Sequence, residues 1–223
     1  MAKKYVNENY IHNCGGKKIE IKKYIKPLTE MEIDKNKVLE LIDFYLFNAP
    51  VLSASKSKND FGLKSLKDYG WVGNADMTKL EGRLLKAADL GMFCFIKSDS
   101  IDQTLESMDL QDKICIEHPR AVLKHNYAVS LRENGSFSVT QHETRMECLF
   151  RHIRNSIAHN HTYLFSNDNI LLEDCDERGV ITARILIPKK ALEAWMVIIK
   201  KIPADAVSNT GDTEDKKSSK KSE

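Results

Sequence analysis

Hydrophobic residues recur at helical spacing along residues 143–165 and predict one amphipathic helix there. The apolar positions step by i, i+3, i+4, i+7 and i+11, and they are Met146, Leu149, Phe150, Ile153 and Ile157. Thr140 and Glu143 have the spacing of a capping box, in which a hydroxyl and a carboxylate each accept a backbone N–H at the helix start. The pattern therefore predicts a helix with one continuous buried stripe.

The other side of this helix carries an uncommon set of polar residues. At 100° per residue, Arg151, Asn155 and His159 line up opposite the apolar stripe, and Arg154 lies on the flank between the two sides. A solvated helix face more often carries Glu and Lys in i, i+4 pairs. Arg, Asn and His together favour a side that binds an anion and moves a proton.

The rest of the pattern predicts mostly helices. Five more are predicted, over residues 29–49, 78–90, 100–108, 119–132 and 188–201. Two of them begin at capping boxes, Thr29 with Glu32 and Thr78 with Glu81. Alternation predicts a short strand over residues 113–117 and a β-hairpin over residues 170–175 and 180–187. The expected fold class is mainly α, a helical bundle with a small β-hairpin after the helix of residues 143–165.

Composition divides the chain of 223 residues into three parts. Residues 1–28 form a basic leader, with seven lysines and two glutamates among the first 26 residues. This leader is either an arm that contacts RNA through lysines and tyrosines or a solvated segment, and the sequence leaves both open. Residues 29–203 form the expected helical domain. Residues 204–223 contain no aromatic residue and are expected to form a disordered tail.

Charge and cysteine content exclude several classes of protein. The net charge is only +2, and no apolar run reaches the roughly 18 residues that a membrane helix needs. The N-terminus lacks the apolar segment of a secretory signal. The five cysteines are scattered without a CxxC pair, which favours a reduced, cytoplasmic chain without a structural zinc site. We expect no cofactor, no metal and no membrane partner.

The chemistry of the polar side fits RNA cleavage. Attack by a 2′-OH needs a base, an acid for the 5′ leaving oxygen and positive charge for the phosphorane. Histidine exchanges a proton near neutral pH, and arginine presents a fork of donors to phosphate oxygens. Asn155 can orient His159 one turn away or donate to a phosphate. Because the helix offers no carboxylate cluster, a metal-independent mechanism fits these residues better than a two-metal one.

The residues Arg154-Asn155-Ser156-Ile157-Ala158-His159 form an R-N-x-x-x-H hexapeptide. This hexapeptide resembles the signature of the HEPN superfamily, in which an arginine, often followed by asparagine, precedes a histidine by five to seven positions. The segment RHIRNSIAHN, followed by a short hairpin and a last helix, resembles the corresponding region of plasmid- and defence-associated bacterial HEPN proteins. The resemblance covers residues 140–201.

The resemblance implies a metal-independent endoribonuclease that acts in phage defence or stress-induced growth arrest. It implies a homodimer through the motif helix, with Arg154 and His159 of both chains facing one composite cleft. His159 would transfer protons, Arg154 would bind transition-state charge, and Asn155 would orient. Arg151, His152 and His161 are candidate supporting or RNA-contacting groups.

Two alternatives remain beside that activity. Some HEPN proteins bind RNA or nucleotides without cleaving them, and others only form scaffolds. A regulatory or antitoxin partner is a further expectation. HEPN toxins that pair with nucleotidyltransferase antitoxins carry a tyrosine two residues after the histidine, and here His161 stands at that position. This departure argues against that particular pairing.

Overall fold

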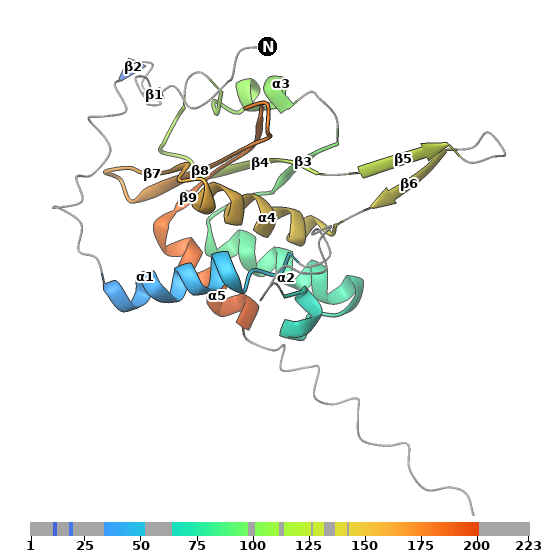
Figure 1. Cartoon of the computed structure of the whole chain (residues 1–223). Coiled ribbons are helices and arrows are strands. Elements are labelled where there is room, and N and C mark those ends of the chain that lie inside the picture. Colours follow the sequence, from blue (N-terminus) through green and yellow to red (C-terminus); the bar gives the residue numbers. More distant parts are fainter. Residues whose placement is uncertain are drawn as a thin grey trace, which may run out of the picture.

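The protein is described here from a computed structural model, which is shown in Figure 1. It describes residues 11–12, 18–19, 34–51, 64–97, 101–111, 114–125, 127–131, 137–141 and 143–200. Most of the expected basic leader, the Thr29/Glu32 capping box and the whole expected tail lie outside these residues. Within the leader, the short strands β1 (Ile11–His12) and β2 (Lys18–Ile19) pair antiparallel.

A five-stranded mixed sheet forms the centre of the molecule. Its strands, in spatial order, are β3 (Cys94–Ile96), β4 (Arg120–Lys124), β9 (Ile181–Pro188), β8 (Asn169–Cys175) and β7 (Thr162–Leu164). The β3–β4 pair is parallel and the other pairs are antiparallel. The β8–β9 hairpin is confirmed at its predicted place, and Gly179 in its turn has a φ of +72°, which favours glycine.

Both faces of this sheet are buried. One face packs on the larger core, to which it contributes Leu123, Leu172 and Ile185, and the other face packs on a second core through Val122, Leu171 and Leu186. Successive strand residues point to opposite faces, so a strand covered on both sides must be apolar throughout. The middle of β4, which is Ala121, Val122 and Leu123, has this character.

Helices cover the two faces unequally, as Figure 1 shows. On the larger core lie α1 (Lys35–Ile42), α2 (Gly73–Ala87), α4 (Arg145–Ala158) and α5 (Lys189–Lys200). α4 lies directly under the sheet, and α1, α2 and α5 form a further layer below it. The short α3 (Ile101–Ser107) covers the opposite face. α1 continues into a π-helical turn, Asp43–Phe47, which packs against α4.

The predicted mainly α bundle is wrong, because the centre of the fold is a mixed sheet. The decisive segment is residues 119–132, predicted as a helix, which form β4 and β5 (Tyr127–Leu131) instead. β5 pairs with β6 (Phe137–Gln141) in a separate two-stranded ribbon. A short apolar run such as that of β4 has the same pattern in a buried strand as in a buried helix, so periodicity alone cannot separate them.

Two helix starts also differ from prediction. α4 begins at Arg145, and its capping box is Thr144 with Glu147 rather than Thr140 with Glu143. α2 begins at Gly73, so Thr78 lies inside the helix. Residues 113–117 form no strand where they are described, and Ile114 makes only an isolated bridge to Leu110.

The helix predicted over residues 143–165 ends at Ala158, and Thr162–Leu164 form β7 instead. Parts of the other helix predictions are confirmed. α3 and α5 lie where the spacing placed them, and the predicted stripe of α5 is buried, namely Leu192, Trp195, Met196 and Ile199. The stripe of α4 is buried from Met146 to Ile153, and Ile157 is half-buried. In the described part of the chain, no helix has both the length and the apolar character that a membrane span requires.

Candidate functional site

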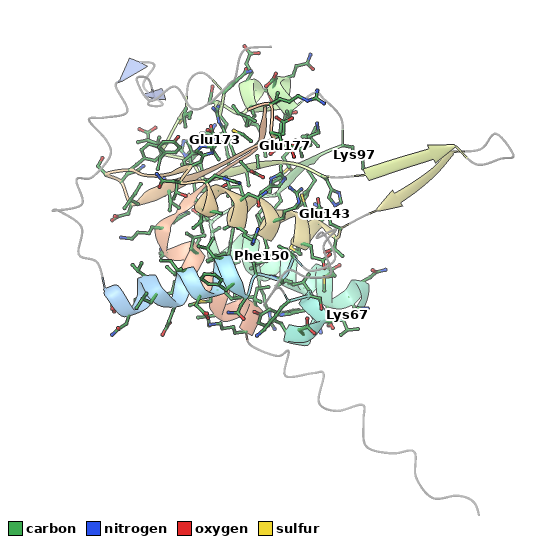
Figure 2. The ribbon with its side chains drawn as sticks, in the orientation of Figure 1. Lys67, Lys97, Glu143, Phe150, Glu173 and Glu177 are labelled. Carbon is green, nitrogen blue, oxygen red and sulfur yellow. The ribbon has the colours of Figure 1, made fainter. Side chains whose placement is uncertain are left out.

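α4 is buried on two sides, and this places its polar residues inside the protein. Phe150, labelled in Figure 2, faces the turn after α1, and its ring contacts those of Phe44 and Tyr45. The opposite side of the helix lies against the ends of β4 and β8. Polar side chains on that side therefore need protein partners, because burial without a hydrogen bond is costly.

His152 and Asp174 form the centre of this network. Nδ1 of His152 lies 2.7 Å from Oδ2 of Asp174, and its Nε2 lies 2.9 Å from the carbonyl oxygen of Lys124. The exposed fraction is 0% for His152 and 3% for Asp174. With both ring nitrogens facing oxygen atoms, the imidazole is fixed between the end of β4 and the end of β8.

Arg151 is paired with Glu143, whose spacing from Thr140 predicted a helix cap instead. Nε and one terminal nitrogen of Arg151 donate to the two carboxylate oxygens at 2.7 and 2.8 Å. Glu143 is buried, whereas the side chain of Arg151 is 18% exposed. Burial works against the charged guanidinium, but the hydrogen bonds and charge of Glu143 outweigh it and raise the pKa of Arg151.

Asn155 extends the network by one helical turn. Its amide nitrogen donates to Oδ2 of Asp174 at 3.2 Å. Burial by itself would raise the pKa of Asp174, but the hydrogen bond and charge of His152, the amide of Asn155 and the charge of Arg151 outweigh burial. The pKa of Asp174 is therefore lower than that of an ordinary aspartate.

A cavity of about 180 Å³ opens beside this network. It is lined by Lys124, Arg151, His152, Asn155, Asp174, Cys175, Asp176 and Thr182. The lining combines three basic side chains, two carboxylates and an amide. Such a cavity can accept a small polar group that both donates and accepts hydrogen bonds.

The three residues of the hexapeptide that were predicted to be catalytic point to different surroundings. Nε of Arg154 donates to the carbonyl of Leu46 at 3.3 Å, which ties α4 to the turn after α1. Asn155 binds Asp174, at the sheet. His159 is the exposed C-cap residue of α4, and its backbone N–H donates to the carbonyl of Asn155 at 2.9 Å.

His161 lies apart from the His152 network. Its ring centroid is 6.4 Å from that of His159. The ring nitrogen, the carboxylate of Glu173 and the thiol of Cys175 gather within 4.8 Å of one another. The structure thus brings Arg151, His152 and Asn155 together, while Arg154, His159 and His161 each lie outside that network.

Sequence reasoning missed two members of the site, Asp174 and the pairing role of Glu143. Asp174 follows the apolar run of β8 directly after Glu173, so two adjacent carboxylates end a buried strand. Charged residues are rarely buried without partners, and this was the available signal. Because Thr140 and Glu143 have the spacing of a capping box, the pairing of Glu143 with Arg151 was not predicted.

A protein-family model matches this chain. The model of the HEPN pEK499 p136 family matches residues 78–210, more than half of the sequence. The matched stretch contains α4, the sheet from β3 to β9 and the whole His152 network. No curated protein and no solved structure matches the chain.

Proposed function

Because the chain belongs to the HEPN pEK499 p136 family, we propose that it is a metal-independent endoribonuclease that cuts RNA by attack of a 2′-OH. The observation that carries this proposal is the exposed position of His159, at the end of a helix that also presents Arg154. Phage defence or stress-induced growth arrest would be its setting.

His159 is the group proposed to transfer protons. It caps the end of α4 and is exposed, so a nucleotide can reach its ring. Histidine serves as either acid or base near neutral pH, which is the capacity that both halves of the cleavage need. One chain offers one such histidine, so a second copy would supply the complementary proton-transfer group.

Arg154 is proposed to stabilise the charge of the phosphorane. Its described hydrogen bond uses Nε, and the guanidinium carries further N–H donors that suit phosphate oxygens. The contact with Leu46 holds the half-buried side chain beside the turn after α1. A positioned arginine of this kind provides preorganised positive charge.

Asn155 is proposed to position the helix rather than to contact RNA. Its amide binds Asp174, which in turn binds His152. This chain of contacts fixes the last turns of α4 on the sheet, and His159 caps that end. Arg151, with its guanidinium held by Glu143, is assigned the same supporting role.

An exposed apolar surface next to Arg154 supports a homodimer. Leu39 is 63% exposed and Phe47 is 58% exposed, and Ile42 lies between them in sequence. The backbone of the residue before Phe47 is the one that Arg154 contacts. Apolar patches of this kind mark association surfaces, and two-fold symmetry would use the same patch twice.

RNA or nucleotide binding without cleavage is the second candidate function. Arg151 binds Glu143 and His152 binds Asp174, so both side chains have partners within the protein. This favours binding without cleavage, because His152 is then not available as a second proton-transfer group. The cavity beside them could hold part of a nucleotide. This function predicts RNA complexes in a gel-shift assay without any change in RNA length.

The first experiment is cleavage of end-labelled total RNA and tRNA by the full chain with EDTA present. We expect products with 2′,3′-cyclic phosphate and 5′-hydroxyl ends, and a fall in rate of about 100-fold or more in His159→Ala. His118→Ala is the matched control, because His118 is an exposed histidine outside the motif. Cleavage that survives in His159→Ala, or that EDTA abolishes, would contradict the proposal.

A further inference from the structure

Three metal-ligating side chains converge on the face of the sheet opposite α4. Glu173 and Cys175 are two residues apart on β8 and point to the same face as Leu171, in the second core. His161 lies across from Glu173, whose backbone N–H donates to the His161 carbonyl at 3.0 Å. One nitrogen, one oxygen and one sulfur ligand atom all lie within 4.8 Å of one another.

We propose that His161, Glu173 and Cys175 bind a divalent cation of the zinc class, with water as the fourth ligand. Imidazole, carboxylate and thiolate are the three protein ligand types of Zn²⁺, and three such ligands with one open position are a common arrangement. Tetrahedral zinc with bonds of 2.0–2.3 Å places its ligand atoms roughly 3.5 Å apart. A shift of about 1 Å, within reach of side-chain rotation, closes the site from the observed separations. On binding, the proton of the Cys175 thiol passes to solvent as the metal–sulfur bond forms.

The surrounding charges favour a cation. The carboxylates of Glu173, Asp174 and Asp176 lie close enough to act on the charge at Cys175, and their negative charge attracts a metal ion to the same place. Arg184 offsets part of this charge, since its Nε donates to Oε2 of Glu173 at 2.8 Å. That contact also orients the Glu173 carboxylate, as second-sphere partners do for metal ligands.

Access separates this cluster from another of similar composition. His161 and Cys175 are half-buried, so an ion can enter from solvent. The second cluster, His125 with Glu143 and Cys148, is completely buried, and both carboxylate oxygens of Glu143 are held by Arg151. A cation would have to break the pair of Arg151 and Glu143 to bind there. We therefore expect no metal ion at this second cluster.

A bound ion would fix the turn that follows α4. His161 is two residues from His159, so a metal bridge from His161 to β8 would anchor the chain just beyond the proposed proton-transfer group. It would also remove His161 from contact with RNA. The site uses neither Arg154 nor His159, and metal binding and RNA cleavage can therefore succeed or fail independently.

The test is titration of the metal-stripped full chain with Co²⁺, followed by displacement with Zn²⁺. We expect one equivalent of Co²⁺ with a thiolate-to-cobalt charge-transfer band, and loss of that band in Cys175→Ser. His161→Gln should retain the band and weaken affinity at least about tenfold. Cys94→Ser is the matched control, because Cys94 is a half-buried free cysteine outside both clusters.

Two results would overturn the proposal. One is the absence of a stoichiometric cobalt complex in the wild-type chain. The other is a band that persists in Cys175→Ser or disappears in Cys148→Ser, which would place the thiolate ligand elsewhere. Circular dichroism of each variant checks the fold, and His161→Gln carries the test if Cys175→Ser does not fold.

Discussion

Asp174 accepts hydrogen bonds from both His152 and Asn155 on the same carboxylate oxygen. The carboxylate therefore joins two successive turns of α4 to β8 in a region that water barely reaches. A buried charge held by several donors stabilises the fold only while all of the partners are present. The residue thus matters for how the helix is held, although the proposed mechanism assigns it no contact with RNA.

We expect Asp174→Asn to lower the free energy of unfolding by about 3 kcal/mol, because it leaves His152 facing a neutral amide in a buried setting. Urea denaturation followed by circular dichroism measures this. Glu177→Gln, a similar change in the exposed turn after β8, should alter stability by no more than about 0.5 kcal/mol.

The difference in stability between wild type and Asp174→Asn should also depend on pH, in a direction that the pKa of Asp174 determines. Because the folded protein lowers the pKa of Asp174, its contribution is present above the pKa of an unfolded aspartate and is lost as pH falls through the folded pKa. The stability gap between wild type and Asp174→Asn should therefore narrow in acid and be constant above about pH 5. A gap that widened on acidification would contradict the assignment.

Single residues show where sequence reasoning reached its limit. The types of Arg151, His152 and Asn155 were recognisable as uncommon on a helix face. Their partners are 8, 22 and 19 residues away in sequence, and only pairing across the fold reveals them. Sequence analysis therefore found half of each contact, and it left open whether Arg151 and His152 support the site or contact RNA.

At the scale of elements, the start of α4 has two competing assignments. Thr144 accepts from the N–H of Glu147 at 3.2 Å, while the Glu147 carboxylate accepts from the N–H of Thr144 at 2.8 Å. This reciprocal pair satisfies two backbone donors that the helix itself leaves without partners. In the predicted capping box, which starts one turn earlier, the Glu143 carboxylate would accept a backbone N–H. It would then not be available to pair with Arg151.

Thr144→Ala should therefore lower the free energy of unfolding by about 1 kcal/mol, the usual cost of losing an N-cap. The matched variant is Thr78→Ala, at a position that the sequence predicted as a cap but that lies within α2, where its hydroxyl donates to the carbonyl of Asn74. Chemical denaturation of both variants should show the larger loss in Thr144→Ala. Equal losses would mean that Thr144 does not cap α4.

α5, which has one exposed face, was predicted well, whereas β4, which is covered on both faces, was predicted as a helix. α5 alternates between core and surface, so its stripe was readable. β4 is covered on both faces, and its run of apolar residues carried no period that could distinguish strand from helix. Predicting β4 as a helix also made the predicted fold class wrong. β4 lies between β3 and the predicted β8–β9 hairpin, so with β4 as a strand these elements form one sheet.

At the scale of the whole molecule, the apolar surface of Leu39, Ile42 and Phe47 and the end of α4 belong to one proposed association face. Arg154 connects them, since its contact with Leu46 lies between Phe47 and the motif helix. A homodimer built on this face would bring two copies of His159 to one cleft.

Phe47→Lys should shift the proposed dimer to a monomer and lower the RNA cleavage rate in proportion to the dimer lost, because a charged side chain in the apolar surface opposes burial. Sedimentation velocity gives the mass and the cleavage assay gives the rate. Met92→Lys is the control, since Met92 is similarly exposed, 65% against 58% for Phe47, but belongs to another part of the chain. A Phe47→Lys protein that remains dimeric would show that association uses a different face.

The ribbon of β5 and β6 extends away from the body in Figure 1, yet its two ends meet. At its base, Nε2 of His125 lies 3.0 Å from the carbonyl oxygen of Glu143, so the chain leaves the sheet and returns to α4 at almost one point. We therefore expect that a foreign hairpin grafted in place of β5 and β6 would leave β4 and α4 in their present positions.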